Sequence, residues 1–277
     1  MVYIVSIVPI VVRLLCLAYI QHIMPRIAII GGSGFYSVPG CTLTEKRLVS
    51  TKYGDVTLFF YRNKDGLDFV FLPRHGEGHT SPPHRINYRA NLMALKQAGV
   101  ESIIAVASVG SLRAHLRPGD FVLPDQFIDF TKSRPSTFFE DEVVHVDMTE
   151  PFCESMRKCI LAAKPAGVKV HEKGTYVCAE GPRFETAAEI RAYSAMGGDV
   201  VGMTMVPEVV LARELGMCYA GIAVITNFAA GISKQVSHAE VLAAMEKIGT
   251  VLADYVVGCL PNVPAERKCA CGVHNGP

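Results

Sequence analysis

The chain alternates between short apolar runs and longer segments in which apolar positions recur with helical spacing. Apolar runs bounded by Gly, Pro or Ser predict strands at residues 26–30, 69–72, 102–107, 121–123, 175–178, 199–203 and 218–226. Helical spacing predicts helices at residues 86–98, 207–215 and 238–257. Strands that alternate with helices are typical of α/β proteins. We therefore expect an α/β fold, in which a single-domain, wound mixed or parallel sheet is flanked by helices.

Capping signals mark where several of these helices begin. Thr186 and Ser237 are each followed three residues later by a glutamate, Glu189 and Glu240, which is the spacing of a capping box. Pro207 suits the first turn of a helix, where its missing N–H costs nothing. We therefore expect an additional helix after Thr186 and a helix start at Ser237.

The two ends of the chain differ in composition from the middle. Residues 1–23 are strongly apolar but are interrupted by Arg13, and they lack a basic N-terminal region and a small-residue cleavage pattern. Met24 stands directly before the first predicted strand. We interpret residues 1–23 as an apolar extension outside the fold, with a membrane anchor as the alternative, residues 24–262 as the folded domain, and residues 263–277 as a tail.

Composition excludes several classes of protein. The net charge of +1, without a long run of Lys or Arg, does not favour a nucleic-acid partner. Nine cysteines scattered over 277 residues indicate reduced thiols in the cytoplasm rather than a disulfide scaffold. The tail contains a C-x-C pair, Cys269 and Cys271. Two cysteines cannot saturate zinc, so a redox pair, a local disulfide and a chance pair remain alternatives.

No metal site and no cofactor are predicted. His75, His79 and His84 lack the helical spacing and the nearby cysteines of zinc sites. The sequence also has no G-x-S-x-G elbow and no recognisable Ser-His-Asp arrangement. Without a metal or a nucleophilic serine, we expect catalysis that depends on substrate binding and hydrogen bonding.

Polar and aromatic residues follow the predicted strands at their carboxyl ends, where open α/β sheets bind ligands. This group comprises Ser33, Arg74, His75, Ser108, Phe184, Thr204 and Asn227. Arg74 can grip a phosphate with two parallel hydrogen bonds, and the neighbouring His75 can donate a third. The Gly31-Gly32-Ser33-Gly34 turn forms either a small anion nest or a plain tight turn. The shared position of these residues predicts one active site.

Several motifs resemble the nucleoside phosphorylase family. They are residues 179–186 (AEGPRFET), 202–208 (GMTMVPE) and 225–227 (ITN), and the resemblance covers residues 26–261. Residues 74–76, 118–129 and 144–152 are similar to the methylthioadenosine phosphorylase branch. The resemblance implies a homotrimer or homohexamer that binds small molecules, with inorganic phosphate as co-substrate.

The resemblance also implies a role for each matching residue. Phosphate would be held by Ser33, Arg74, His75, Ser108 and Thr204. Met203 would lie under the ribose, and Phe184 would stack against the purine. His145 from the neighbouring subunit would close the 5′ end of the sugar. For Phe184 and Met203, ordinary core packing is the alternative that the sequence alone leaves open.

Base preference depends on residues 227, 229 and 185. The methylthioadenosine branch typically carries two aspartates around the base, and this chain has Asn227 and Ala229 there. An amide NH₂ donates to O6 and N7 of a 6-oxopurine, and Glu185 can accept from N1–H and from the 2-amino group of guanine. His238 resembles the histidine that binds the 5′-hydroxyl, although it also suits the first turn of a helix.

We therefore predict phosphorolysis of inosine and guanosine in purine salvage, with Asn227, Glu185 and His238 as the catalytic residues. Within the same family the alternative is a 5′-methylthioinosine phosphorylase. A nucleoside hydrolase and a non-catalytic purine-binding module are further alternatives.

Overall fold

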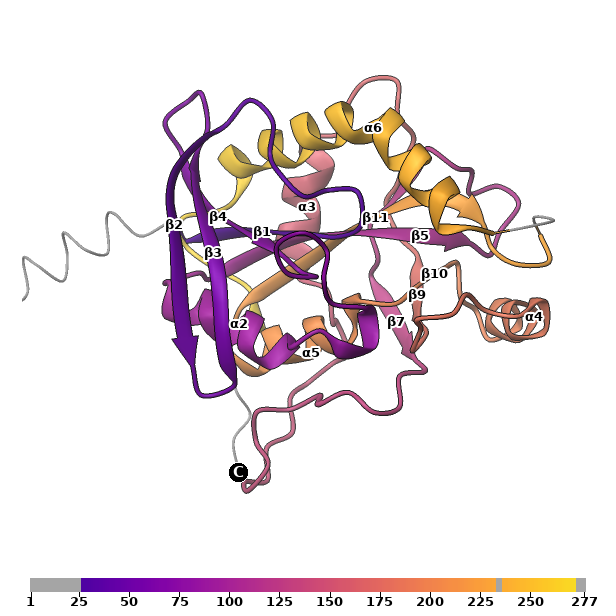
Figure 1. Ribbon diagram of the computed structural model, residues 1–277, viewed down its shortest axis with the longest axis horizontal. Coiled ribbons are helices and arrows are strands. Elements are labelled where there is room, and N and C mark those ends of the chain that lie inside the picture. Colours follow the sequence, from indigo (N-terminus) through magenta and orange to yellow (C-terminus); the bar gives the residue numbers. More distant parts are fainter. Residues whose placement is uncertain (1–25, 233–235, 273–277) are drawn as a thin grey trace, which may run out of the picture.

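The computed structural model of the protein describes residues 26–232 and 236–272 (Figure 1). The predicted extension at residues 1–23 lies outside the described residues. Within them, the chain forms one mixed sheet of eleven strands with helices on both faces. The expected α/β fold with a single-domain wound sheet is confirmed.

The centre of the sheet is built from four parallel strands. β1 (Ile27–Gly31) lies between β4 (Asp68–Pro73) and β5 (Ser102–Ser111), and β5 also pairs with β11 (Cys218–Phe228). These strands are nearly continuous apolar runs because helices cover both of their faces. Their carboxyl ends therefore meet at one edge of the sheet.

An antiparallel hairpin that the sequence analysis missed extends one side of the sheet. β2 (Thr42–Thr51) pairs with β3 (Gly54–Arg62), and β3 pairs with β4. β2 is exposed along most of its length and contains Glu45, Lys46 and Arg47. Such a charged edge strand has no buried face, so the apolar pattern that identifies a strand is missing.

The other side of the sheet is made of short strands. β10 (Val200–Gly202) is antiparallel to the end of β5 and parallel to β9 (Thr175–Cys178), which pairs with β7 (Gln126–Asp129). β6 (Phe121–Val122) bridges β11 and β8 (Val170–His171).

Helices cover the two faces of the sheet (Figure 1). α3 (Glu154–Ala162) and α6 (His238–Cys259) pack on one face, and α2 (Tyr88–Gln97) and α5 (Met205–Glu214) pack on the other. α4 (Ala187–Ala195) lies at the periphery near β7, β9 and β10. Three short 3₁₀ helices complete the described elements: η1 (Pro83–Arg85), η2 (Leu260–Asn262) and η3 (Ala270–Gly272).

The predicted caps agree well with the observed helix starts. Thr186 and Glu189 form the reciprocal capping box expected for α4. At α6, Ser237 accepts the backbone N–H of Glu240. Helix α2 begins two residues later than predicted because the side chain of Asn87 accepts from the N–H of Ala90 and caps it. Helix α3 was not predicted.

The predicted tail is attached to the body of the protein within residues 263–272. Cys271 is 4% exposed and belongs to the core between α3, α6 and the sheet. Arg26 donates to the carbonyl of Ala265, and Arg267 donates to that of Gly216. Across the two described ranges, none of the helices has the length and apolar character needed to cross a bilayer.

Candidate active site

A pocket lies at the carboxyl ends of β1, β4, β5, β10 and β11 and reaches the first turn of α6. Ten of the eleven site residues predicted from the sequence line it: Ser33, Arg74, His75, Ser108, Phe184, Glu185, Met203, Thr204, Asn227 and His238. His79 also lines the pocket, whereas His84 does not. His145 lies exposed in the long loop between β7 and α3, away from this pocket in its own chain.

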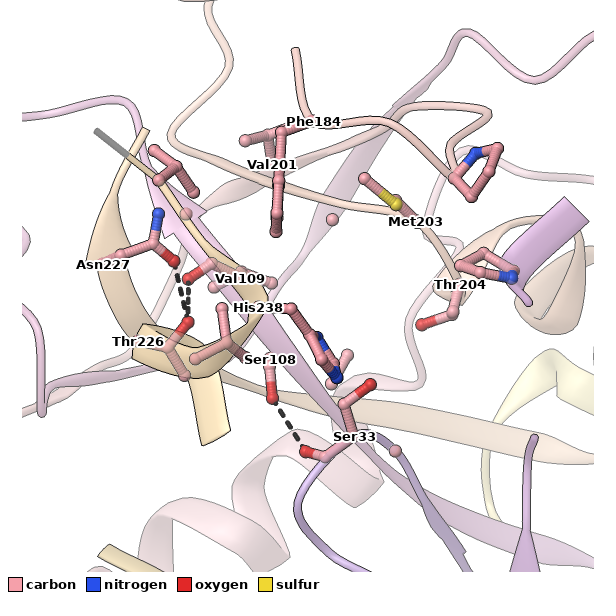
Figure 2. A pocket seen from close by; sticks show the side chains of 18 of the residues that line it. Ser33, Ser108, Val109, Phe184, Val201, Met203, Thr204, Thr226, Asn227 and His238 are labelled. Carbon is pink, nitrogen blue, oxygen red and sulfur yellow. Dashed lines mark hydrogen bonds between the residues drawn. The ribbon is translucent and has the colours of Figure 1, made fainter. Parts of the chain in front are cut away.

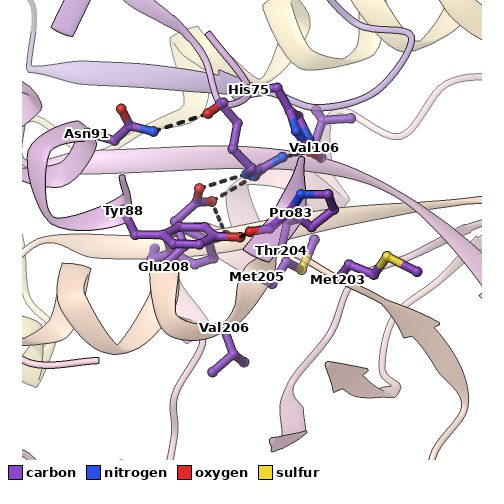
Figure 3. A network of polar contacts seen from close by, with 12 residues as sticks. His75, Pro83, Tyr88, Asn91, Val106, Met203, Thr204, Met205, Val206 and Glu208 are labelled. Carbon is purple, nitrogen blue, oxygen red and sulfur yellow. Dashed lines mark hydrogen bonds and ion pairs between the residues drawn. The ribbon is translucent and has the colours of Figure 1, made fainter. Parts of the chain in front are cut away.

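Arg74 is fully buried and forms an ion pair with a carboxylate that the sequence analysis did not identify. Its Nε and Nη2 donate to the two oxygens of Glu208, each at 2.7 Å, and its Nη1 donates to the carbonyl of Val106. Glu208 also accepts from the hydroxyl of Tyr219. Figure 3 shows Glu208 and Val106 within this network.

This pairing limits what Arg74 offers to a ligand. A guanidinium has five N–H donors, and three of them already have partners. One N–H on Nη1 and one on Nη2 remain, so Arg74 can still reach a phosphate. Glu208 neutralises its charge, because an isolated buried charge would be costly. Arg74 therefore acts as a rigid, preorganised donor.

Gly32 makes room for this donor. A Cβ added at Gly32 would lie 2.8 Å from the carbonyl oxygen of Val106 and 2.9 Å from Nη1 of Arg74. Glu208 holds the guanidinium in place, so it cannot move aside. Glycine is therefore needed here for close approach, and not only to form a turn.

We expect Gly32→Ala to raise KM for phosphate on the order of 10- to 10²-fold, because displaced binding groups lose their alignment. The measurement is initial rate against phosphate concentration at saturating nucleoside. Gly249→Ala on α6 is the matched control, since among the described residues its added Cβ would meet nothing within 4 Å beyond its chain neighbours and the backbone of its own helix. Equal phosphate KM values in the two variants would contradict this account of Gly32.

His75 is buried and neutral in the free enzyme. Burial lowers its pKa to about 3. Its Nδ1 lies 2.8 Å from the carbonyl oxygen of Ser81, and because a carbonyl only accepts, Nδ1 carries the ring proton. Nε2 is then an acceptor. The predicted hydrogen bond from His75 to phosphate therefore requires the ring to gain a second proton, whereas the neutral ring can accept a proton from hydrogen phosphate.

Three hydroxyl groups face the same part of the pocket. Figure 2 shows Ser33, Ser108 and Thr204 around it. Ser108 donates its hydroxyl proton to the carbonyl of Ser33 and so ties β5 to the turn after β1. The backbone N–H of Thr204 donates to the hydroxyl of Tyr176. These bonds fix the backbone at Ser33 and Thr204, whose own hydroxyls can then donate to an anion.

The opposite end of the pocket presents an amide. Asn227 is 4% exposed, and its Oδ1 accepts from the hydroxyl of Thr226 at 2.9 Å (Figure 2). Its Nδ2 donates one hydrogen to the carbonyl of Phe228. One N–H remains, so Asn227 offers a single oriented donor rather than the separate donors to O6 and N7 that we predicted.

An irregularity in the sheet helps to place this amide. β11 pairs with β5 in regular register up to Ile225 and Val109, but the next pair is Asn227 with Gly110, so Thr226 is an extra residue. Bulges of this kind re-aim side chains beside active sites. The hydroxyl of Thr226 orients the Asn227 amide.

Glu185 supplies the complementary acceptor. Its Oε1 is buried and has no hydrogen-bond partner among the described residues. It lines the same pocket as Asn227, and burial raises the pKa of its carboxyl. An unsatisfied buried acceptor costs about 1–3 kcal/mol, so a ligand that brings an N–H donor gains that energy on binding.

Comparison with known proteins agrees with this geometry. The sequence model of the Phosphorylase superfamily matches residues 26–261. The chain belongs to the Phosphorylase superfamily. It is 52% identical over 258 residues to the 6-oxopurine nucleoside phosphorylase of Pyrococcus furiosus, covering 90% of this chain and 97% of that protein.

Other relatives in this superfamily carry different names. A probable S-methyl-5′-thioinosine phosphorylase of Methanothermobacter thermautotrophicus is 46% identical, covering 88% of this chain and 87% of that protein. Among solved structures, the methylthioadenosine phosphorylase of Schistosoma mansoni in complex with adenine aligns with a TM-score of 0.82 and 37% identity. That alignment covers 88% of this chain and 93% of that chain. The resemblance stated from the sequence motifs is therefore confirmed.

Two residues outside the pocket lining, Glu208 and Arg134, hold pocket residues in place. The sequence analysis predicted a role for neither. Arg134 is 9% exposed, and its guanidinium donates to backbone carbonyls that include those of Met203, Val206 and Glu180. It thereby joins the turns after β9 and β10. Glu208 stands in the recognised 202–208 motif, so a search for the partner of Arg74 could have found it. Arg134 lies in an irregular loop that gives no such signal.

Proposed function

We propose that the chain catalyses phosphorolysis of 6-oxopurine nucleosides, inosine and guanosine, to the free base and ribose 1-phosphate. The observation that carries the proposal is the pair of Asn227 and Glu185 in one pocket. Within residues 26–232 and 236–272, Asn227 keeps one N–H without an acceptor and Glu185 has a buried oxygen without a donor. A 6-oxopurine presents acceptors at O6 and N7 and a donor at N1. The 6-oxopurine nucleoside phosphorylase name of the Pyrococcus furiosus relative supports the same substrate class.

The mechanism follows from the two ends of the pocket. A phosphate oxygen attacks C1′ while the bond between C1′ and the purine breaks, and the bonding electrons pass into the base. The bound phosphate stabilises the positive charge that develops on the sugar. The remaining N–H of Asn227 stabilises negative charge on the purine, and Glu185 fixes the base by accepting from N1–H. Inorganic phosphate is a co-substrate in this scheme.

The decisive experiment follows release of hypoxanthine from inosine with and without inorganic phosphate. We expect release to depend on phosphate and ribose 1-phosphate to form in equal amount. Release at the same rate without phosphate would identify a hydrolase, and binding without release would identify a purine-binding module. Either outcome would reject the proposal.

The same assay with 5′-methylthioinosine tests the alternative within the family. His238 lines the pocket with Val236 and Val241, so its imidazole stands next to apolar side chains. His238 and His79 lie with ring centroids 6.1 Å apart, and His79 is 4.2 Å from His75. The imidazole of His238 favours a 5′-hydroxyl and the two valines favour a methylthio group. A strong preference for methylthioinosine would indicate that Val236 and Val241, rather than His238, bind the 5′ substituent of the sugar.

Glu185 gives a test through pH and stability. A raised pKa means that the folded enzyme holds this proton more tightly than the unfolded chain, so the ionised carboxylate reduces stability at neutral pH. This penalty disappears as the pH falls through the raised pKa. We expect Glu185→Gln to melt at a higher temperature than the wild type at neutral pH, with a difference that shrinks as the pH falls toward the ordinary pKa of a glutamate.

The same variant should bind inosine poorly, because an amide does not replace the carboxylate acceptor fully. Wild-type KM for inosine should rise as the pH falls and Glu185 is protonated, whereas KM of the Gln variant should stay level. Glu246→Gln, at an exposed position on α6, is the control and should change neither property. A Gln variant with wild-type KM and melting temperature would reject this role.

We further propose that the enzyme is a cytoplasmic homotrimer or homohexamer in which His145 reaches the neighbouring pocket. The exposed loop that carries His145 is compatible with such a contact. Sedimentation equilibrium would measure the assembly, and mixing the His145→Ala chain with the weakly active Asn227→Ala chain would test whether the sites are shared.

A further inference from the structure

Four cysteines from three distant parts of the chain meet at the amino end of β11, the opposite end of this strand from the pocket. Cys153 precedes α3, Cys218 begins β11, and Cys269 and Cys271 come from the tail. Their four sulfur atoms all lie within 4.8 Å of one another. Cys153, Cys218 and Cys271 are buried and Cys269 is half-buried. The C-x-C pair that could not saturate a metal alone thus acquires two more thiols.

The spacing of the sulfur atoms fits a tetrahedral ion. Zinc binds thiolates at about 2.3 Å, so the sulfurs of a tetrahedral site are about 3.8 Å apart. The Sγ atoms of Cys218 and Cys269 are 3.3 Å apart, well beyond the roughly 2.05 Å of a disulfide bond. A single ion at the centre of the four sulfurs could bond to all of them with small movements.

The cluster lies beside a helix N-terminus. Cys153 directly precedes α3, where the helix dipole stabilises negative charge. Four thiolates and one divalent ion carry a net charge of −2, which this dipole partly offsets.

The position of the cluster indicates a structural role. Cys218 and Asn227 are nine residues apart on β11, which crosses the sheet (Figure 1). At about 3.3 Å per residue they are separated by about 30 Å, so an ion at the cluster cannot contact the substrate. All four ligand positions are filled by protein, as in structural zinc sites. The ion would fasten the tail to α3 and β11.

We propose that Cys153, Cys218, Cys269 and Cys271 bind one zinc ion in a closed tetrathiolate site. This inference departs from the absence of a metal site predicted from the sequence and does not depend on the proposed function. On binding, the thiols release their protons and form four zinc–sulfur bonds, without oxidation or reduction.

The test is metal content of the full chain, purified without a metal-binding tag and under reducing conditions, by inductively coupled plasma mass spectrometry. We expect one zinc ion per chain. Cys269→Ser/Cys271→Ser should lower zinc content roughly tenfold or more, since two of the four ligands are lost. These tail positions avoid altering the buried start of β11. Cys41→Ser, at a thiol outside the cluster, is the control and should retain zinc.

Three further measurements distinguish a zinc site from disulfides and from free thiols. Cobalt substituted for zinc should give thiolate-to-cobalt charge-transfer absorption in the wild type and not in the double variant. A chelator should lower the melting temperature of the wild type only. An intact mass that shows two disulfides, or four reduced thiols without metal, would overturn the proposal. Equal zinc content in the wild type and the double variant would also overturn it.

Discussion

Asn227→Ala should lower kcat for inosine phosphorolysis on the order of 10²-fold or more, the usual cost of removing a donor that stabilises developing negative charge. The reason is specific to this site, because Thr226 and Phe228 already hold the amide and leave one N–H for the base. Steady-state kinetics at saturating phosphate measures the effect. An unchanged kcat would remove Asn227 from the mechanism.

Two companion variants sharpen this test. Asn262→Ala is the matched control and should leave kcat unchanged, because Asn262 is exposed and does not line the pocket. Asn227→Asp replaces the donor with an acceptor, so cleavage of adenosine should rise relative to inosine. If that ratio does not rise, the base is not recognised through position 227.

Glu208→Ala should lower the free energy of unfolding by about 3–5 kcal/mol, because it leaves a fully buried guanidinium without its counter-charge. Both side chains of the Arg74–Glu208 pair have zero exposure. Loss of the carboxylate also removes the partner of the Tyr219 hydroxyl. Urea denaturation measures this loss, and KM for phosphate should rise in the same variant because Arg74 is no longer held.

The control is an ion pair on the surface. Glu45 and Arg47 form a similar two-bond pair with side chains that are 46% and 37% exposed. Water screens such a pair, so Glu45→Ala should cost less than about 1 kcal/mol. Glu208→Gln, which keeps the shape of the side chain, serves if Glu208→Ala does not fold. If Glu208→Ala lowers the free energy of unfolding no more than Glu45→Ala does, the buried ion pair contributes no more to stability than the exposed one.

The sequence by itself determined the central sheet, the starts of α4 and α6, and ten of the residues that line the pocket. Strands β1, β4, β5 and β11 were predictable because burial on both faces makes them continuously apolar. Thr186 and Ser237 marked helix starts because a cap bonds backbone groups only three residues away. The ends of parallel strands meet at one edge, so residues as distant as Ser33 and Asn227 could be assigned to one site.

Only the tertiary structure decided which partners hold the side chains of those residues and how the side chains are oriented. The pairing of Arg74 with Glu208 spans 134 residues, and no local pattern encodes it. The bulge at Thr226 depends on the register between β11 and β5, and the bond from His75 to Ser81 depends on a loop conformation. The meeting of Cys153 and Cys218 with the tail cysteines likewise follows from packing. Local sequence fixes local backbone bonds and apolar faces, whereas partners of buried charges and thiols are set by which elements come together in space.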